Sequence, residues 1–349
     1  MSQILIIAPS WVGDTVMAQP LFMRLKEHDP HAVIDVFAPA WVAPILRRMP
    51  EVNEVIANPF IHGELKLRAR WKLARQLARR RYNQAIVLPN SLKSALIPFF
   101  AGIPRRTGFV GEMRYGLLND ARKLDEEAYP LMVERFALLA DPPGRPFVRP
   151  VPNPRLKVDE TQRLAALAKL GLDKQGPAVA LCPGAEYGPA KRWPEAHFAA
   201  LARLLDERGY ATWIVGSSKD QAIGDAIVAA SGGNCRNLCG ETSLDEAVDI
   251  LASAAAIVTN DSGLMHVAAA LDKPTAAIYG SSSPRFTPPL SAAAHIVSLN
   301  LPCSPCFKRE CPLGHLDCLR KLAPELVMTI VEPLLPPVAT GQPQPGHTP

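Results

Sequence analysis

The stretch TNDSGLMH, residues 259–266, joins the apolar run AAAIV to the alanine-rich run VAAAL. An apolar run, a polar turn and a helical pattern in this order predict a strand that leads into a helix. The first turn of such a helix combines unpaired N–H groups with the positive end of the helix dipole, which suits an anion. Asp261 or Ser262 could also simply cap the helix, and this stretch alone leaves both interpretations open.

The same strand-to-helix unit recurs along the chain. ILIIAP, AVIDVFA, EVIA and QAIVLP predict strands in the first half, and AVALCPG, YATWIVG, AAIVTN and TAAIYG predict strands in the second. Helical patterns separate these strands, which is typical of parallel βαβ units. We therefore expect an α/β protein with two tandem Rossmann-like, doubly wound domains that face each other across a cleft.

A proline-rich segment predicts where one domain ends and the next begins. Residues 141–155, DPPGRPFVRPVPNPR, are too rich in proline for a helix or a strand and indicate a linker. We place the N-terminal domain at residues 1–150 and the C-terminal domain at residues 151–335. Residues 336–349 contain few apolar side chains and are expected to form a flexible tail.

Composition narrows the class of protein. No run approaches the roughly 20 apolar residues of a membrane span, and MSQILIIAP at the N-terminus lacks the features of a secretory leader. We therefore expect a cytoplasmic protein. Seven cysteines, an odd number, argue against a secreted disulfide framework. Residues 1–150 carry 21 Lys and Arg against 14 Asp and Glu, and the remainder carries 17 against 19, so the first half should meet an anionic partner.

The turn after the first predicted strand, SWVGDTV at residues 10–16, contains a single glycine. The dinucleotide fingerprint G-x-G-x-x-G is therefore absent, and the turn does not indicate a nicotinamide cofactor. Asp14 at the end of a strand could act as a general base in the cleft between the domains. The alternative is that Asp14 caps the helix that follows.

The corresponding turn of the second domain is PGAEYGPAKRWPE, residues 183–195. Gly184 permits close backbone approach, and Lys191 and Arg192 bring positive charge to the strand edge that also carries TNDSGLMH. Two cations beside a helix N-terminus predict a diphosphate site. An ordinary solvated basic loop is the other interpretation.

Together these motifs resemble a known family, the ADP-heptose:lipopolysaccharide heptosyltransferases, whose fold is glycosyltransferase B. The resemblance spans nearly the whole chain and depends on PSWVGD, PGAEYGPAKRWP, NDSGLMHVAAAL and CSPCFKRECPLGHLDC, in that order. It implies inverting, metal-independent transfer of heptose from ADP-L-glycero-D-manno-heptose to the first heptose of the lipopolysaccharide inner core. The lipid-linked heptosyl-Kdo-lipid A acceptor further implies peripheral contact with the cytoplasmic face of the inner membrane.

The resemblance also implies roles for individual residues. Asp14 matches the family's catalytic base, and Lys191 matches the lysine at the leaving group. The implied donor-binding residues are Gly184, Arg192, Ser217, Asp220, Asp261, Ser262, Gly263 and His266. The match of Ser217 and Asp220 to the nucleoside site is looser. His266 could instead be a packed structural histidine.

A basic segment, ELKLRARWKLARQLARRR at residues 64–81, carries eight Lys or Arg between residues 66 and 81. Leu67, Trp71, Ala74 and Ala78 share one helical face, which predicts that this face packs and that the opposite, cationic face is exposed. The cations would attract the anionic acceptor or the membrane surface. A solvated charged face without a partner is the alternative.

Four cysteines lie close together near the C-terminus, Cys303, Cys306, Cys311 and Cys318, with His315 among them. Their spacing lacks the paired C-x2-C knuckles of common zinc ribbons, so packed thiols are favoured over a structural zinc. The implied mechanism needs no metal cofactor. The segment marks the branch of the family that uses an acceptor already bearing heptose.

Two further functions stay open from the sequence. One is heptosyltransferase I or a glycosyltransferase of the same fold with another nucleotide sugar. The other is a protein that binds nucleic acid through the arginine-rich helix. Aromatic residues make up only 6% of the chain, and no recognisable nucleic-acid-binding module is present, so binding to nucleic acid is not expected.

Overall fold

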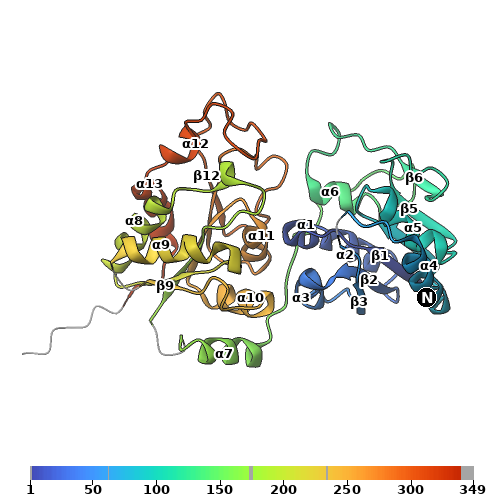
Figure 1. The fold of residues 1–349 in the computed structure, drawn as a ribbon, viewed down its shortest axis with the longest axis horizontal. Coiled ribbons are helices and arrows are strands. Elements are labelled where there is room, and N and C mark those ends of the chain that lie inside the picture. Colours follow the sequence, from blue (N-terminus) through green and yellow to red (C-terminus); the bar gives the residue numbers. More distant parts are fainter. Residues whose placement is uncertain (1, 62, 173–175, 233–234, 339–349) are drawn as a thin grey trace, which may run out of the picture.

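The computed structural model describes residues 2–61, 63–172, 176–232 and 235–338, and shows two α/β domains side by side (Figure 1). Each domain is built on a six-stranded sheet whose neighbouring strands run parallel. The strand order is β3-β2-β1-β4-β5-β6 in one sheet and β12-β11-β10-β7-β8-β9 in the other. In both domains, therefore, the first strand lies beside the fourth, and the predicted pair of Rossmann-like domains is confirmed.

The N-terminal sheet is covered by helices on both faces. Its strands are β1 (Gln3–Ile7), β2 (Val33–Pro39), β3 (Glu54–Asn58), β4 (Gln84–Val87), β5 (Arg105–Phe109) and β6 (Asp120–Arg122). On one face lie α1 (Val12–Met17), α2 (Gln19–His28), α3 (Ala43–Arg47) and α6 (Met132–Ala137), and on the other lie α4 (Leu67–Leu77) and α5 (Leu92–Phe100). Side chains of β1 alternate between the two cores, which explains why the strand is apolar throughout.

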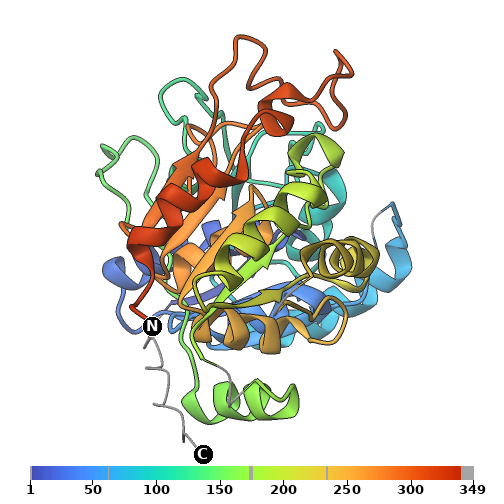
Figure 2. The ribbon, with the colours of Figure 1, turned by 90° about the vertical axis from the view of Figure 1, so that its left-hand side faces the viewer.

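The C-terminal sheet repeats this arrangement. Its strands are β7 (Ala178–Cys182), β8 (Ala211–Ile214), β9 (Cys235–Asn237), β10 (Ala256–Asn260), β11 (Thr275–Ile278) and β12 (Ala294–Val297). Figure 2 looks onto this domain, with α8 (Glu195–Asp206) and α13 (Pro324–Val331) crossing in front of the sheet. The other helices are α7 (Glu160–Lys169), α9 (Gln221–Ser231), α10 (Leu244–Ser253), α11 (Gly263–Ala270) and α12 (Asp317–Arg320).

The structure adds detail that the periodicity of the sequence did not predict. The helical pattern after β1 forms two helices, α1 and α2, which meet at Ala18, because Pro20 lies in the first turn of α2 and has no N–H to donate. Strands β5, β6, β9 and β12 were not predicted. They lie toward the edges of the sheets and include polar side chains.

The proline-rich segment 141–155 contains no helix or strand, as predicted for a linker. Its end is held by the N-terminal domain, because the Gln19 side chain donates to the Arg155 carbonyl (2.8 Å) and accepts from the Arg155 N–H (2.7 Å). The next residue, Leu156, donates its N–H to the carbonyl of Ala270 in α11 (2.9 Å). Most of the predicted tail, residues 339–349, lies outside the described residues.

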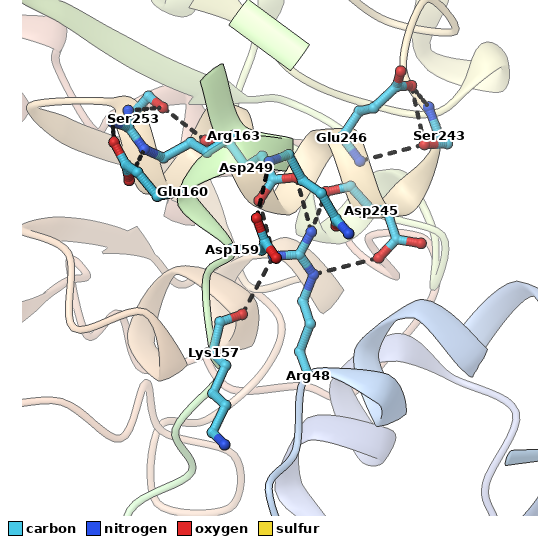
Figure 3. Close-up of polar contacts among 11 residues, drawn as sticks. Arg48, Lys157, Asp159, Glu160, Arg163, Ser243, Asp245, Glu246, Asp249 and Ser253 are labelled. Carbon is cyan, nitrogen blue, oxygen red and sulfur yellow. Dashed lines mark hydrogen bonds and ion pairs between the residues drawn. The ribbon is translucent and has the colours of Figure 1, made fainter. Parts of the chain in front are cut away.

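A buried ion pair links the two domains next to the end of the linker (Figure 3). Arg48, directly after α3, makes two hydrogen bonds to the Asp249 carboxylate of α10, at 2.8 and 2.9 Å. The same guanidinium donates to the side chain of Asp245 and to the carbonyl of Lys157 (both 3.3 Å). Both Arg48 and Asp249 are buried, so this contact forms part of the interior rather than a surface pair.

Within the part of the chain that the structure describes, no helix has the length and hydropathy to cross a membrane.

Candidate active site

The segment after β1 in the N-terminal domain meets the segments after β7 and β10 in the C-terminal domain. In doubly wound sheets, ligands bind at the carboxyl ends of the strands where the strand order reverses, here between β1 and β4 and between β7 and β10. The helix after β1, α1, packs directly against the helix after β10, α11. The candidate site is therefore built by two switch points in different domains.

Two glycines allow this close approach of α1 and α11. A Cβ atom at Gly13 would lie 2.8 Å from Cδ2 of His266, and a Cβ atom at Gly263 would lie 2.9 Å from Cβ of Val12. Both distances are shorter than a Cβ atom tolerates. Gly263 was predicted to be a donor-binding residue, and the structure shows that its missing side chain makes room for the opposite domain. Whether its N–H also binds phosphate stays a prediction.

Asp14 lies in the first turn of α1 and is a carboxylate without a hydrogen-bond donor among the described residues. The helix is not capped by this side chain: Thr15 Oγ1 donates to the Trp11 carbonyl, and the helix has no side-chain cap. The capping interpretation of Asp14 is therefore wrong. Burial raises the pKa of Asp14 to about 6, and the positive charge of Lys191 partly opposes that rise. The role of Asp14 as a general base stays a prediction, and a carboxyl poised near neutral pH is suited to it.

Lys191 and Asp261 form the centre of the C-terminal half of the site. Lys191 ends the short 3-10 turn Pro189–Lys191 after β7, and its Nζ lies 2.5 Å from Oδ2 of Asp261. Nζ also lies 5.1 Å from the ring centroid of Tyr187. The Asp261 side chain is 4% exposed, and its carboxylate bonds the lysine instead of capping α11. The pair holds the lysine ammonium group beside the start of α11.

Asn260, the residue before Asp261, holds the loop after β7 to the end of β10. No role was predicted for it from the sequence. It is fully buried, accepts a hydrogen bond from the Trp193 N–H (3.0 Å) and donates one to the Pro183 carbonyl (2.7 Å). The loop that carries Lys191 is thereby fixed to the end of β10. The sequence did contain a signal for this role: an asparagine at the last position of a buried strand needs hydrogen-bond partners for its side-chain amide.

The start of α11 has the properties of an anion site. Ser262 is the N-cap residue in extended conformation, and no side chain caps the helix. Its first N–H groups are thus left for a ligand, at the positive end of an apolar, buried helix. His266, one turn into this helix, is buried, and burial lowers its pKa to about 4. The imidazole is therefore neutral at pH 7, and its ring packs on Gly13 of the other domain.

The remaining predicted donor-binding residues gather on the neighbouring loops after β7 and β8. A Cβ atom at Gly184 would lie 2.7 Å from the Asp220 carboxylate, so these two loops touch. Ser217 and Asp220 bond each other in a capping box, with Ser217 N and Oγ at 2.9 and 2.8 Å from Asp220 Oδ2. Arg192 donates to the Ala185 carbonyl of its own loop. Ligand contacts of these four residues stay predictions.

Comparison with known proteins now places the chain in a family. The model of glycosyltransferase family 9 (heptosyltransferase) matches residues 70–317. Lipopolysaccharide heptosyltransferase 2 of Escherichia coli K12 is 50% identical over 95% of this chain and 98% of its own length. The chain belongs to glycosyltransferase family 9. Lipooligosaccharide heptosyltransferase 2 of Haemophilus influenzae is 48% identical over 85% of this chain and 88% of its own length.

A solved structure supports the same assignment. The structure described as E. coli ADP-heptose lps heptosyltransferase II superimposes with a TM-score of 0.86 at 47% identity, over 96% of this chain and 98% of that chain. The predicted resemblance to heptosyltransferases is confirmed. The alternative that the chain is a nucleic-acid-binding protein instead of an enzyme is wrong, because the chain is a family 9 glycosyltransferase.

In this family 9 chain, the cysteine segment supports the loop of Lys191. Cys303, Cys306, Cys311, Cys318 and His315 line one small pocket, whose wall includes Ala190. Ala190 donates its N–H to the Arg309 carbonyl (3.0 Å), and the Tyr187 hydroxyl donates to the Phe307 carbonyl (2.8 Å).

All of these cysteines are free thiols. Among the described residues, no three His, Cys, Asp or Glu side chains are placed to hold a metal ion. The interpretation as packed thiols, with zinc as the less favoured alternative, stays a prediction.

The packing of the basic helix α4 agrees with the prediction only in part. Ala74 is buried and Ala78 packs against the core, as predicted. Leu67 and Trp71 were also expected to pack against the domain, but they are 49% and 55% exposed, and Arg70 and Leu77 are buried instead. Hydrophobic spacing missed this because the Arg70 guanidinium is buried, satisfied by the carbonyls of Leu65, Glu64 and Lys93. The exposed face of α4 is therefore both cationic and apolar.

Proposed function

We propose that this glycosyltransferase transfers heptose from ADP-L-glycero-D-manno-heptose to the first heptose of the lipopolysaccharide inner core, with inversion. The observation that carries the proposal is the meeting of α1 and α11. It sets a carboxylate with a pKa of about 6, Asp14, opposite a lysine and an uncapped helix N-terminus in the other domain. A base on one side and positive charge on the other are what a single displacement at a sugar phosphate needs.

In the proposed reaction, the N-terminal domain (residues 1–150) binds the acceptor and the C-terminal domain (residues 151–335) binds the donor. Asp14 accepts the proton of the acceptor hydroxyl while its oxygen forms a bond to the anomeric carbon. The bond from that carbon to the diphosphate breaks, and ADP leaves with the electron pair. One displacement inverts the anomeric configuration.

The charge that grows on the departing ADP is met by groups of the C-terminal domain. The bond to Asp261 holds Lys191 beside the start of α11, whose first N–H groups can bind the same phosphate groups. Neutral His266 can donate one hydrogen bond to phosphate or sugar from this turn. Because these groups supply positive charge, the proposed mechanism requires no metal cofactor.

The acceptor distinguishes the proposed activity from that of heptosyltransferase I. The relatives from E. coli and H. influenzae both carry the name heptosyltransferase 2, which favours an acceptor that already bears heptose. A lipid-linked acceptor of this kind implies that the enzyme works in the cytoplasm, in peripheral contact with the inner membrane.

The test is ADP release from ADP-heptose with two matched Kdo-lipid A acceptors, one bearing the first heptose and one lacking it. The proposal expects turnover with the heptose-bearing acceptor and a product of opposite anomeric configuration. Turnover only with the acceptor that lacks heptose would assign the chain to the heptosyltransferase I activity. Turnover only with another nucleotide sugar would remove ADP-heptose as the donor.

A further inference from the structure

The loop after β3 and the start of α4 form an unusual surface, which we call the 61–75 patch. It comprises four exposed apolar side chains and four basic ones: Ile61, Leu65, Leu67, Trp71, Lys66, Arg68, Lys72 and Arg75. The apolar members are 60%, 48%, 49% and 55% exposed in that order. Single exposed apolar residues are common on proteins, but a cluster that includes a tryptophan marks an interaction site.

The arrangement on the helix combines the two kinds of side chain on one face. Leu67, Trp71 and Arg75 follow one another at intervals of four residues, so they form one row along α4. Arg68 and Lys72 form a basic row on one side of it. The packed residues Ala74 and Leu77 lie along the opposite side of the Leu67–Trp71–Arg75 row. A helix with an apolar row beside a basic row fits the boundary between lipid headgroups and acyl chains.

The free charges of the patch are almost all positive. Within the described residues, no carboxylate pairs with Arg68, Lys72 or Arg75. The segment 61–75 contains a single acidic residue, Glu64, which binds Lys66 at 2.7 Å. An anionic surface therefore complements this patch, and a neutral or acidic protein face would leave either its charges or its apolar groups unmatched.

The loop is held rigidly in its exposed position by a buried charge. Arg70 Nε donates to the Leu65 carbonyl (2.7 Å), and Nη2 donates to the Glu64 carbonyl (3.1 Å). The guanidinium also lies 4.1 Å from the ring centroid of Phe60. Lys66 has a φ of 39°, a left-handed conformation that is uncommon for a residue with a side chain and needs such support. The chain thus keeps its apolar side chains outward by specific contacts.

The position of the patch links it to the active site. The loop follows the carboxyl end of β3, and in a parallel sheet the carboxyl end of β1, after which Asp14 lies, belongs to the same edge. In Figure 2 the light-blue chain of residues 63–75 projects from the body of the molecule. A flat surface that contacts the projection would lie beside the edge where the acceptor is proposed to bind.

We propose that the 61–75 patch binds the anionic leaflet of a membrane, with Leu67 and Trp71 inserted at the headgroup level and the basic residues on the lipid phosphates. The location of the acceptor in that leaflet rests on the proposed function, but binding of the patch to lipid does not. Docking would hold the enzyme on the surface that carries its substrate, so it should lower the acceptor KM without changing the donor KM.

The test uses the full chain and sedimentation with vesicles of phosphatidylcholine containing about a third phosphatidylglycerol. Replacing three separate cations near a surface, in Arg68→Ser/Lys72→Ser/Arg75→Ser, should weaken vesicle binding about 10²-fold at low salt. Leu67→Ser/Trp71→Ser should weaken it at high salt as well, where charge attraction is screened. The matched control is Leu164→Ser/Leu326→Ser, which changes two exposed helical leucines of the other domain and should bind like the parent.

A second readout separates this inference from the proposed function. Turnover on a deacylated, soluble acceptor should be the same for the parent and all three variants, whereas the KM for acceptor in vesicles should rise for the two patch variants only. Unchanged vesicle binding in both patch variants would overturn the inference, as would a patch that binds an oligonucleotide or a second copy of the chain instead of vesicles. If the parent protein does not turn over the soluble acceptor at all, the proposed function is overturned. Lipid binding by the patch is then still tested by the sedimentation experiment.

Discussion

Lys191 and Asp261 form an ion pair of 2.5 Å within the C-terminal domain, and the charge of this lysine still lowers the pKa of Asp14 in the N-terminal domain. The two side chains, which lie in different domains, are therefore electrostatically coupled. Lysine is also held in place before donor binds, since Asp261 is buried and has the lysine as its charged partner. Removing either member should therefore affect more than one step.

Lys191→Ala should weaken donor binding and slow the chemistry, because the proposed mechanism places this cation on the phosphate before and during its departure. We expect a loss of about 10²- to 10³-fold in kcat, as for other groups that stabilise developing negative charge. Calorimetry with ADP and turnover assays measure the two effects. Lys169→Ala, which breaks an exposed lysine–glutamate pair elsewhere in this domain, is the control and should leave both unchanged.

The pH dependence of kcat/KM should report Asp14. The carboxyl must lose its proton to act as a base, so activity should rise with pH through about 6. Because the charge of Lys191 lowers the pKa of Asp14, Lys191→Ala should move this midpoint to higher pH. A midpoint that stays in place in the variant would mean that the two groups are not coupled.

Asp14→Asn should make the folded protein more stable near neutral pH. The carboxyl has a higher pKa in the folded chain than its ordinary value of 3.8, so folding disfavours the ionised form. The cost is absent below about pH 4, grows as pH rises toward 6 and is then complete. A shift of about two pKa units corresponds to at most about 3 kcal/mol. Urea unfolding of both proteins at pH 7 and at pH 4 checks this, since the difference should appear only at pH 7.

Arg48→Met should destabilise the contact between the domains. The change leaves the buried Asp249 carboxylate without its two hydrogen bonds from the guanidinium, which typically costs about 3–5 kcal/mol. The matched control is Arg208→Met, which removes a more exposed pair with Glu332 and should cost less than about 1 kcal/mol. Thermal melts of the two variants give the comparison. Equal melting temperatures would show that the interdomain pair contributes little.

Much of the site was predictable because each motif directly follows a strand. Asp14, Lys191 and Asp261 each lie at the carboxyl side of a predicted strand, and parallel sheets bring such positions to one edge. Their motifs also resemble those of a family, which supplied the expected partners. The structure adds that the residues meet through α1 and α11, an orientation of two domains that local patterns do not contain.

Other features depend on contacts between distant parts of the chain. Arg48 and Asp249 lie 201 positions apart, and each reads as an ordinary charged residue of a surface helix. Part of the packed face of α4 was predicted wrongly for a related reason: Arg70 is buried because loop carbonyls surround it, and Trp71 is exposed. Periodicity places side chains on faces, but it does not tell which face an unusual polar contact will bury.

The roles of Asp14 and of the C-terminal domain are separated most directly by one pair of measurements on Asp14→Asn. Removal of a general base typically costs about 10²- to 10⁴-fold in rate. The donor is proposed to bind the other domain, so kcat should fall by this factor while the Kd for ADP-heptose, measured by calorimetry, stays within about twofold of the parent value. Near-normal turnover of Asp14→Asn would contradict the account, because Asp14 would then serve the structure of α1 and not the displacement.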